Sequence, residues 1–221
     1  MNIVELGTTE YQTAWEAMRD YTAARTADSA DALWLTEHPP VFTLGQAGDP
    51  AHVLAAGDIP LVRSDRGGQV TYHGPGQIVV YVLVDLARRR FGVRPLVRLL
   101  EDAVVAVLAR HGIAAAGRVD APGVYVGAAK IASIGLRVRH GRSFHGLAFN
   151  ADMDLEPFSR INPCGYQGLQ VTDARRQGIP DSVPALRAQL AQEICARWQA
   201  AGSENIAADA SAAVPLPTTA A

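Results

Sequence analysis

Three stretches of this sequence combine glycine with residues that can bind or react. The first, Arg66 to Gln77, contains four glycines and leads into an apolar run. Glycine permits tight turns and a close approach of the backbone to a ligand. A turn alone needs neither arginine nor histidine, so the segment predicts a binding loop. Its spacing fits neither G-x-x-x-x-G-K-[ST] nor G-x-G-x-x-G, so nucleotide binding has no support from motifs.

The second stretch is a predicted hairpin whose two strands are joined by His140-Gly141, with glycine supplying a positive φ. In this register Ser133 pairs with Ala148 and Gly135 with Gly146. Directly opposed residues share one face of a ribbon, so four small residues lie together there. They form either a shallow trough for a bulky ligand or a surface that admits a packed helix.

Lys130 is the single lysine among 20 Lys and Arg residues. One explanation is a mutational bias towards arginine to which Lys130 is a chance exception. The other is that Lys130 belongs to a site whose function arginine cannot perform. Lysine offers a compact ammonium and a pKa that its surroundings can shift, whereas arginine stays protonated. Strict alternation puts Lys130 on the face opposite the small residues. Either a bulge intervenes or Lys130 precedes the regular strand.

The third stretch places Cys164 between proline and glycine in a polar loop, whereas Cys195 follows Ile194 on an apolar helical pattern. A thiol reacts as thiolate, from an ordinary pKa of about 8.5 that nearby cations lower. From the end of the hairpin, about thirteen residues lead to Cys164 and can span roughly 40 Å, so contact with Lys130 is possible. The pair would form an ion-paired or acid/base dyad. From the residues alone, a reactive thiol and an inert loop thiol both stay open.

The elements that must position these residues interleave helices with hairpin strands, which indicates an α+β fold with a mixed, largely antiparallel sheet. One helix is expected from a cap at Thr8 or Thr9, and the last helix from about 184 to 200. We expect one domain over 1–201 and a disordered tail over 202–221, which is rich in Ala, Ser, Thr and Pro. The other expected elements are strands at 1–6, 32–35, 41–44, 61–64, 78–86, 124–126, 130–139 and 142–150 and a helix at 95–110 with an apolar stripe.

Composition sets the class of protein. The 221 residues are 48% hydrophobic and 19% charged, with a net charge of −2. This balance suits a globular domain and argues against a protein that coats nucleic acid. Apolar runs are too short to span a bilayer, and the N-terminus lacks a secretory signal. Two cysteines exclude a disulfide scaffold, and no cluster has the spacing of a metal site, so we expect a cytoplasmic protein without a metal.

Four motifs together resemble those of one family, the lipoyl(octanoyl) transferases of lipoate biosynthesis, over roughly residues 1–200. They occur in the family's order and spacing, which makes the resemblance specific. The motifs are Arg66-Gly67-Gly68-x-x-Thr71-Tyr72-His73-x-x-Gly76-Gln77-x-Val79-x-Tyr81, Gly127-x-x-Lys130-Ile131-Ala132-Ser133-Ile134-Gly135, His145-Gly146-Leu147-Ala148-Phe149-Asn150 and Asn162-Pro163-Cys164-Gly165.

The resemblance implies a fold similar to the catalytic domain of biotin and lipoate protein ligases. It implies that Cys164 is the acyl-thioester nucleophile and that Lys130 lowers the pKa of this thiol and assists proton transfer. It implies no cofactor. The substrate-binding residues that it implies are Arg66, Gly67, Gly68, Gln69, Val70, Thr71, Tyr72, His73, Ser133, Ile134, Gly135, Gly146, Leu147 and Ala148.

The resemblance also implies the reaction and its partners. An octanoyl group, and in some cases a lipoyl group, would pass from octanoyl-acyl carrier protein to the target lysine of lipoyl domains, as the first step of endogenous protein lipoylation. The acceptors would be lipoyl domains of 2-oxoacid dehydrogenase E2 subunits and the glycine cleavage H protein, with no nucleic acid or membrane partner. Two alternatives are an ATP-dependent lipoate or biotin ligase, which would not need Cys164, and a non-catalytic module that binds carrier proteins.

Overall fold

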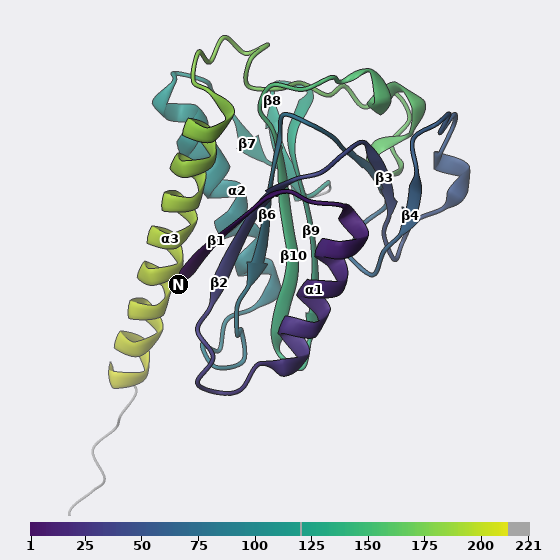
Figure 1. The fold of residues 1–221 in the computed structure, drawn as a ribbon. Coiled ribbons are helices and arrows are strands. Elements are labelled where there is room, and N and C mark those ends of the chain that lie inside the picture. Colours follow the sequence, from purple (N-terminus) through teal and green to yellow (C-terminus); the bar gives the residue numbers. More distant parts are fainter. Residues whose placement is uncertain (120, 212–221) are drawn as a thin grey trace, which may run out of the picture.

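The computed structural model describes residues 1–119 and 121–211, and for Cys164 and residues 202–211 it describes the backbone alone. Within these residues, two sheets and three long helices make up the fold (Figure 1). The strands are β1 (Asn2–Thr8), β2 (Ala32–Glu37), β3 (Val41–Leu44), β4 (Leu61–Arg63), β5 (Val70–His73), β6 (Gln77–Leu83), β7 (Ala116–Gly117), β8 (Gly123–Val126), β9 (Ala129–Arg139) and β10 (Arg142–Asn150). The helices are α1 (Tyr11–Ala24), α2 (Val93–Arg110) and α3 (Val183–Ser211), and the short 3₁₀ turns are η1 (Pro50–His52), η2 (Glu156–Arg160) and η3 (Pro163–Gly165).

The large sheet has seven strands among the described residues, in the order β1-β2-β6-β10-β9-β8-β7. Only the pair β1–β2 is parallel, and the other pairs are antiparallel. A smaller sheet, β4-β3-β5, lies beside it. The expectation of an α+β fold with a mixed, largely antiparallel sheet is therefore confirmed.

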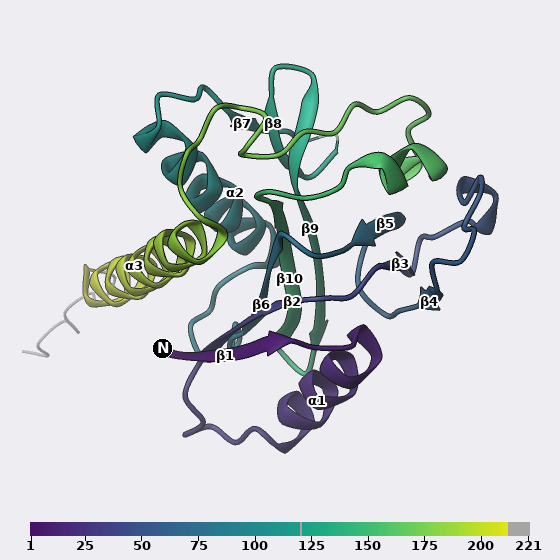
Figure 2. The same ribbon diagram turned by 45° about the horizontal axis from the view of Figure 1, so that its top comes forward.

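Helices cover both faces of the large sheet, with α2 and α3 on one face and α1 on the other (Figures 1 and 2). All seven residues of the central strand β6 are buried. Its side chains alternate: Val80 and Val82 join the core under α2 and α3, whereas Val79 and Tyr81 join the cluster under α1. Burial on both faces explains why this strand reads as a continuous apolar run.

The amphipathic pattern of α2 corresponds to the observed helix. The residues of its predicted stripe are buried against the sheet, and the helix begins at Val93, two positions before the expected Pro95. Gly112 follows the end of the helix with φ +72°, a conformation that glycine adopts without strain.

The predicted cap of α1 is wrong. The helix begins at Tyr11, and Glu10 occupies the N-cap position without a capping side-chain hydrogen bond. The hydroxyl of Thr9 instead donates to Leu6 O (3.1 Å) and so supports the turn that leaves β1. The neighbouring Thr8 belongs to β1 itself.

The C-terminal helix is longer than its pattern predicts. It continues through Ser211, past the expected end near Ala200, and Trp198 is its last residue seen to be buried. For 202–211 the helical backbone differs from the expected disorder. The rest of the expected tail, 212–221, lies outside the described residues.

The small sheet was not predicted, because Val70–His73 lies inside the segment that we interpreted as a binding loop. It pairs with β3 and encloses a separate apolar cluster that includes Phe42 and Phe158.

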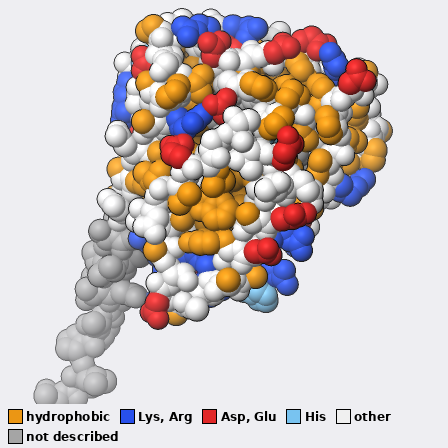
Figure 3. Space-filling view, in the orientation of Figure 1, with side chains coloured by type: hydrophobic (Ala, Val, Ile, Leu, Met, Phe, Trp, Pro, Cys, Tyr) orange, Lys and Arg blue, Asp and Glu red, His pale blue; other side chains and the backbone are white. Residues whose placement is uncertain are grey.

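On the face shown in Figure 1, hydrophobic side chains gather towards the middle (Figure 3). None of the helices in the described part of the chain is both long and apolar enough to cross a membrane.

Candidate active site

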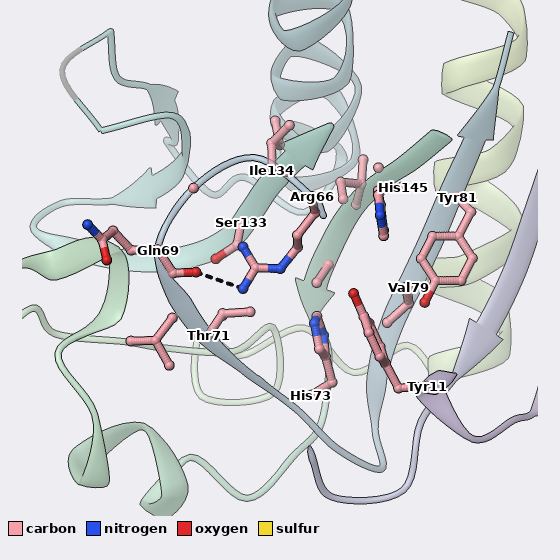
Figure 4. A pocket seen from close by; sticks show the side chains of 16 residues that line it. Tyr11, Arg66, Gln69, Thr71, His73, Val79, Tyr81, Ser133, Ile134 and His145 are labelled. Atoms are coloured by element: carbon pink, nitrogen blue, oxygen red, sulfur yellow. Dashed lines mark hydrogen bonds between the residues drawn. The ribbon is translucent and has the colours of Figure 1, made fainter. Parts of the chain in front are cut away.

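The glycine-rich loop after β4 is built around one buried arginine. The guanidinium of Arg66, a residue 8% exposed, donates from Nη1 to Gly67 O (2.9 Å) and from Nη2 to Thr43 O (2.6 Å) and Gln69 O (2.8 Å). The backbone N–H of Gly67 donates to Leu136 O of β9 (3.0 Å). These bonds hold the loop between β3 and the large sheet, where it forms one wall of a pocket (Figure 4).

The pocket, which has a volume of about 520 Å³ and is partly open to solvent, lies between this loop, α1 and one face of β6, β9 and β10. Its lining consists of Tyr11, Arg66, Gly68, Gln69, Val70, Thr71, His73, Val79, Tyr81, Ser133, Ile134, Gly135, His145, Gly146, Leu147 and Ala148. Every residue that we expected to bind substrate lies there except Gly67 and Tyr72. The Tyr72 ring packs away from the pocket, against Phe42 and Phe158.

The hairpin register is confirmed residue for residue. Ser133 pairs with Ala148 and Gly135 with Gly146, and His140 and Gly141 both have positive φ. A Cβ on Gly146 would lie 2.0 Å from the carbonyl oxygen of Val80. The four small residues form one wall of the pocket, and Ala148 also belongs to the apolar cluster that packs under α1.

A bulge decides where Lys130 points. The pairing of β8 with β9 shifts register between Val124 and Tyr125, so that Val124 pairs with Ala132 but Tyr125 with Lys130. Ile131 and Ala132 both pack into the core under α2 and α3. Because two successive side chains face that core, alternation returns Lys130 to the opposite face, which carries the pocket.

The Lys130 side chain is held in this position by several contacts. The residue is 3% exposed, its Nζ donates to Pro122 O (2.9 Å), and it lies 5.4 Å from the centre of the Tyr125 ring. Its backbone pairs with residues 170–172, since Lys130 N donates to Gln170 O (2.8 Å). A buried cation thus lies at the end of β9, three residues before the pocket residue Ser133.

Four lining residues were missing from the predicted site: Tyr11, Val79, Tyr81 and His145. The sequence did contain a signal for Val79 and Tyr81. They lie two positions apart in the first family motif, so on a strand they face the same side of the sheet. His145 has φ +60° in the middle of β10, a conformation rare for a residue with a side chain. Nothing in the sequence near Tyr11 indicated that α1 would close the pocket.

Neutral polar groups surround the end of the pocket that carries His73, Tyr81 and His145. Burial lowers the pKa of His73 well below its ordinary value, and neighbouring His38 and Arg66 act in the same direction. Burial also raises the pKa of Tyr81, whose hydroxyl lies 2.6 Å from His38 Nε2. His145 Nε2 lies 2.8 Å from an oxygen of the Asp65 carboxylate. Apart from Arg66, the groups here are uncharged or paired, which suits an uncharged ligand.

The backbone around Cys164 approaches the other end of the pocket. A Cβ placed on Gly165 would lie 3.5 Å from Cγ of Gln69, which lines the pocket. The preceding Asn162 is fixed by its N–H, which donates to His52 O (2.8 Å). The side chain of Cys164 lies outside the described residues, so its distance from Lys130 remains a prediction.

The two ends of the pocket therefore differ. In Figure 4, Gln69 and Ser133 lie on one side of the pocket, and Tyr11 and Tyr81 lie on the other. Within the described residues, no group of three or more His, Cys, Asp and Glu side chains converges to hold a metal ion.

Comparison with known proteins identifies the family. The family model described as lipoyl protein ligase A/B catalytic domain matches residues 10–198. An octanoyltransferase of Nitrosomonas europaea is 55% identical over 192 residues, which cover 87% of this chain and 94% of that protein. An octanoyltransferase of Thiobacillus denitrificans is 60% identical over 179 residues, or 81% of this chain and 82% of that protein.

Solved structures agree on the fold. A bi-partite lipoate protein ligase of Thermoplasma acidophilum superimposes with a TM-score of 0.71 at 18% identity, covering 90% of this chain and 83% of that one. The biotin protein ligase of Aquifex aeolicus gives a TM-score of 0.55 at 9% identity, covering 92% of this chain and 71% of that one. The expected similarity to the biotin and lipoate ligase fold is confirmed. On the strength of the family model and of relatives with more than half of their aligned residues identical, this chain belongs to the octanoyltransferases of the lipoyl protein ligase A/B family.

Proposed function

We propose that this acyltransferase moves an octanoyl group from octanoyl-acyl carrier protein to the target lysine of lipoyl domains. The acceptors would include lipoyl domains of 2-oxoacid dehydrogenase E2 subunits and the glycine cleavage H protein. The observation that carries this proposal is the pocket itself. One of its walls is the trough of small residues on β9 and β10, and an uncharged aromatic end lies opposite Gln69 and Ser133. Burying one CH₂ group there would stabilise the complex by about 0.8 kcal/mol.

The chemistry begins with Cys164 as nucleophile. Its thiolate attacks the thioester carbonyl of the donor, the carbon–sulfur bond to the pantetheine breaks, and the pantetheine leaves as a thiolate, which then takes up a proton from solvent. The enzyme then carries the octanoyl group as a thioester on Cys164. Exchange of one thioester for another is nearly even in free energy, so this step needs no ATP.

The second step transfers the group to an amine. The ε-amine of the acceptor lysine attacks the acyl-enzyme, loses a proton and forms an amide, while the Cys164 sulfur leaves as thiolate. Lys130 would stabilise this thiolate with its ammonium charge and assist the proton transfer. Supporting this role, Lys130 is a buried cation on the face of β9 that carries the pocket, and a Cβ placed on Gly165, next to Cys164, would lie 3.5 Å from Cγ of the pocket residue Gln69.

The test is to trap the acyl-enzyme. After incubation with octanoyl-acyl carrier protein, intact mass and peptide mapping should detect one octanoyl group on Cys164 and none in Cys164→Ser. Cys195→Ser is the matched control, because Cys195 is half-buried on α3, burial raises the pKa of its thiol, and its sulfur lies 3.7 Å from that of Met1. An adduct on Cys195, or none at all, would refute the proposed intermediate.

The same assay separates the alternatives. If free octanoate and ATP sustain transfer to a lipoyl domain without an acyl-carrier donor, the protein acts as a ligase. If the carrier protein binds but no adduct forms, it acts as a binding module. Because the proposed nucleophile is a free thiol, a reducing compartment would preserve it, and we propose the cytoplasm as the location.

A further inference from the structure

A second concave surface lies outside the pocket, at the β7–β8 edge of the large sheet. It has a volume of about 850 Å³, much of it open, and runs between α2 and the segment that joins β7 to β8. We call it the arginine groove and define it by Arg94, Arg98, Glu101, Arg118, Val119 and Pro122. It shares no lining residue with the pocket.

The groove presents positive charge from both of its walls. Arg94 and Arg98 are exposed and lie one helical turn apart on α2. Arg118 faces them from the joining segment, with its guanidinium carbon 5.0 Å from the centre of the Tyr125 ring. Since the chain uses arginine almost everywhere, the placement of these three side chains, rather than their type, carries the argument.

Among the described groove residues, only Glu101 is acidic, and it is turned inward. The residue is buried, and its carboxylate accepts a hydrogen bond from Gly123 N (2.9 Å). Burial raises the pKa of this carboxyl group, while the hydrogen bond from Gly123 and the charge of Arg98 act in the opposite direction. Val119, on the joining segment, is in contrast 92% exposed and offers apolar area to a partner. Asp120 lies outside the described residues.

The groove is connected to the candidate active site through its own wall. Pro122 lines the groove, and its carbonyl oxygen accepts the hydrogen bond from Lys130 Nζ (2.9 Å). The next residue, Gly123, pairs with the pocket residue Ser133. A protein seated in the groove would therefore lie beside the strand that pairs with β9, on the α2 side of the sheet, whereas the pocket opens on the α1 side.

We propose that the arginine groove docks the donor carrier protein, through acidic side chains of that protein and the phosphate of its pantetheine arm. This inference rests on the proposed function. The donor is favoured over the acceptor because only the donor brings a phosphate together with the reacting group. Arginine binds both carboxylates and phosphates with paired, charge-assisted hydrogen bonds.

The experiment compares two donors on one charge-reversal variant, Arg94→Glu/Arg98→Glu, by the rate at which the acyl-enzyme forms. With octanoyl-acyl carrier protein at low salt, we expect kcat/KM to fall roughly 10- to 100-fold, because attractive steering is replaced by repulsion. High salt should reduce the difference in kcat/KM between the variant and the unaltered protein. With octanoyl-pantetheine, which lacks both protein and phosphate, the rate should stay within about twofold, which also shows that the variant folds.

Arg139→Glu is the matched control. Arg139 is exposed at the far end of β9 from Lys130, about 30 Å away along the strand, and should not alter the donor rate. Equal losses with both donors would overturn the proposal, as would an unchanged rate with the carrier protein. A loss confined to transfer onto the lipoyl domain would assign the groove to the acceptor instead. Failure of the proposed function looks different, since neither donor would then acylate Cys164 in the unaltered protein.

Discussion

The substitution Arg66→Lys tests how the glycine-rich loop is held. It keeps the charge but removes the planar guanidinium, whose bonds converge on Thr43, Gly67 and Gln69. Nε and Nη2 both reach the Thr43 hydroxyl (3.1 and 2.9 Å), and Nη2 also reaches two carbonyl oxygens. A lysine ammonium has three donors on one atom and cannot reach acceptors that are spread around the edge of the guanidinium plane.

The expected magnitude follows from these bonds. Losing two of them, at about 1.5–3 kcal/mol each for a charged donor, lowers the free energy of unfolding by roughly 3–6 kcal/mol. Domains are commonly stable by about 5–15 kcal/mol, so the variant should fold but with reduced stability. The loosened loop should also weaken acyl-enzyme formation, because it forms a wall of the pocket.

Urea unfolding followed by circular dichroism measures the loss. Arg63→Lys on β4 is the control, because Arg63 is exposed and a conservative surface change should cost less than about 0.5 kcal/mol. A loss below about 1 kcal/mol in Arg66→Lys would refute the view that this guanidinium organises the loop. An equal loss in both variants would refute it as well.

Other outcomes are expected from single features. Burial lowers the pKa of His73 below its ordinary 6.5. As the pH falls, this imidazole therefore takes up a proton in the unfolded chain before it does so in the folded protein. The free energy of unfolding should drop by up to about 2 kcal/mol from pH 7 to pH 5. His73→Gln should reduce that drop in urea titrations, and an unchanged drop would contradict the assignment. Lys130→Arg should keep the fold but slow acyl transfer roughly 10²- to 10⁴-fold in a single-turnover assay, because arginine cannot exchange a proton; equal rates would remove Lys130 from acid/base chemistry. Ala148→Leu should lower kcat/KM for octanoyl more than for butanoyl thioesters, since it fills the pocket wall, and an equal loss for both would show that the wall does not meet the chain. Deleting residues 204–221 should leave activity and Tm unchanged, because Trp198 and the buried face before it remain, and lost activity would contradict this reading of the C-terminus.

Local rules were sufficient for several parts of the fold. The β9–β10 register followed from one two-residue turn, because a turn of that length fixes every later pair of a hairpin. The apolar stripe of α2 and the continuous run of β6 each identified a buried face. The motifs also named most of the pocket, since residues 66–73 and the two hairpin strands lie close together in the fold as in the prediction.

Three features escaped local reasoning because distant segments decide them. The hydroxyl of Thr9 bonds to the end of β1, and its N–H donates to Glu37 O at the end of β2. Thr9 is therefore part of the turn between β1 and α1, and the predicted threonine N-cap does not form. The small sheet forms because β3 pairs with β5, and a long intervening segment separates these two strands in the sequence. Tyr11 lines the pocket only because α1 packs over the face of the sheet that carries Val79 and Tyr81.

The sequence by itself determined the family, the hairpin register and the residues of the binding loop, because motifs and turns act over short stretches of chain. The tertiary structure alone decided the direction of Lys130. Strict alternation pointed this side chain away from the pocket, and the bulge opposite Val124 and Tyr125 reversed it. A bulge depends on how neighbouring strands fit together, and the pairing of Lys130 with residues 170–172 fixes that fit from a distant part of the chain.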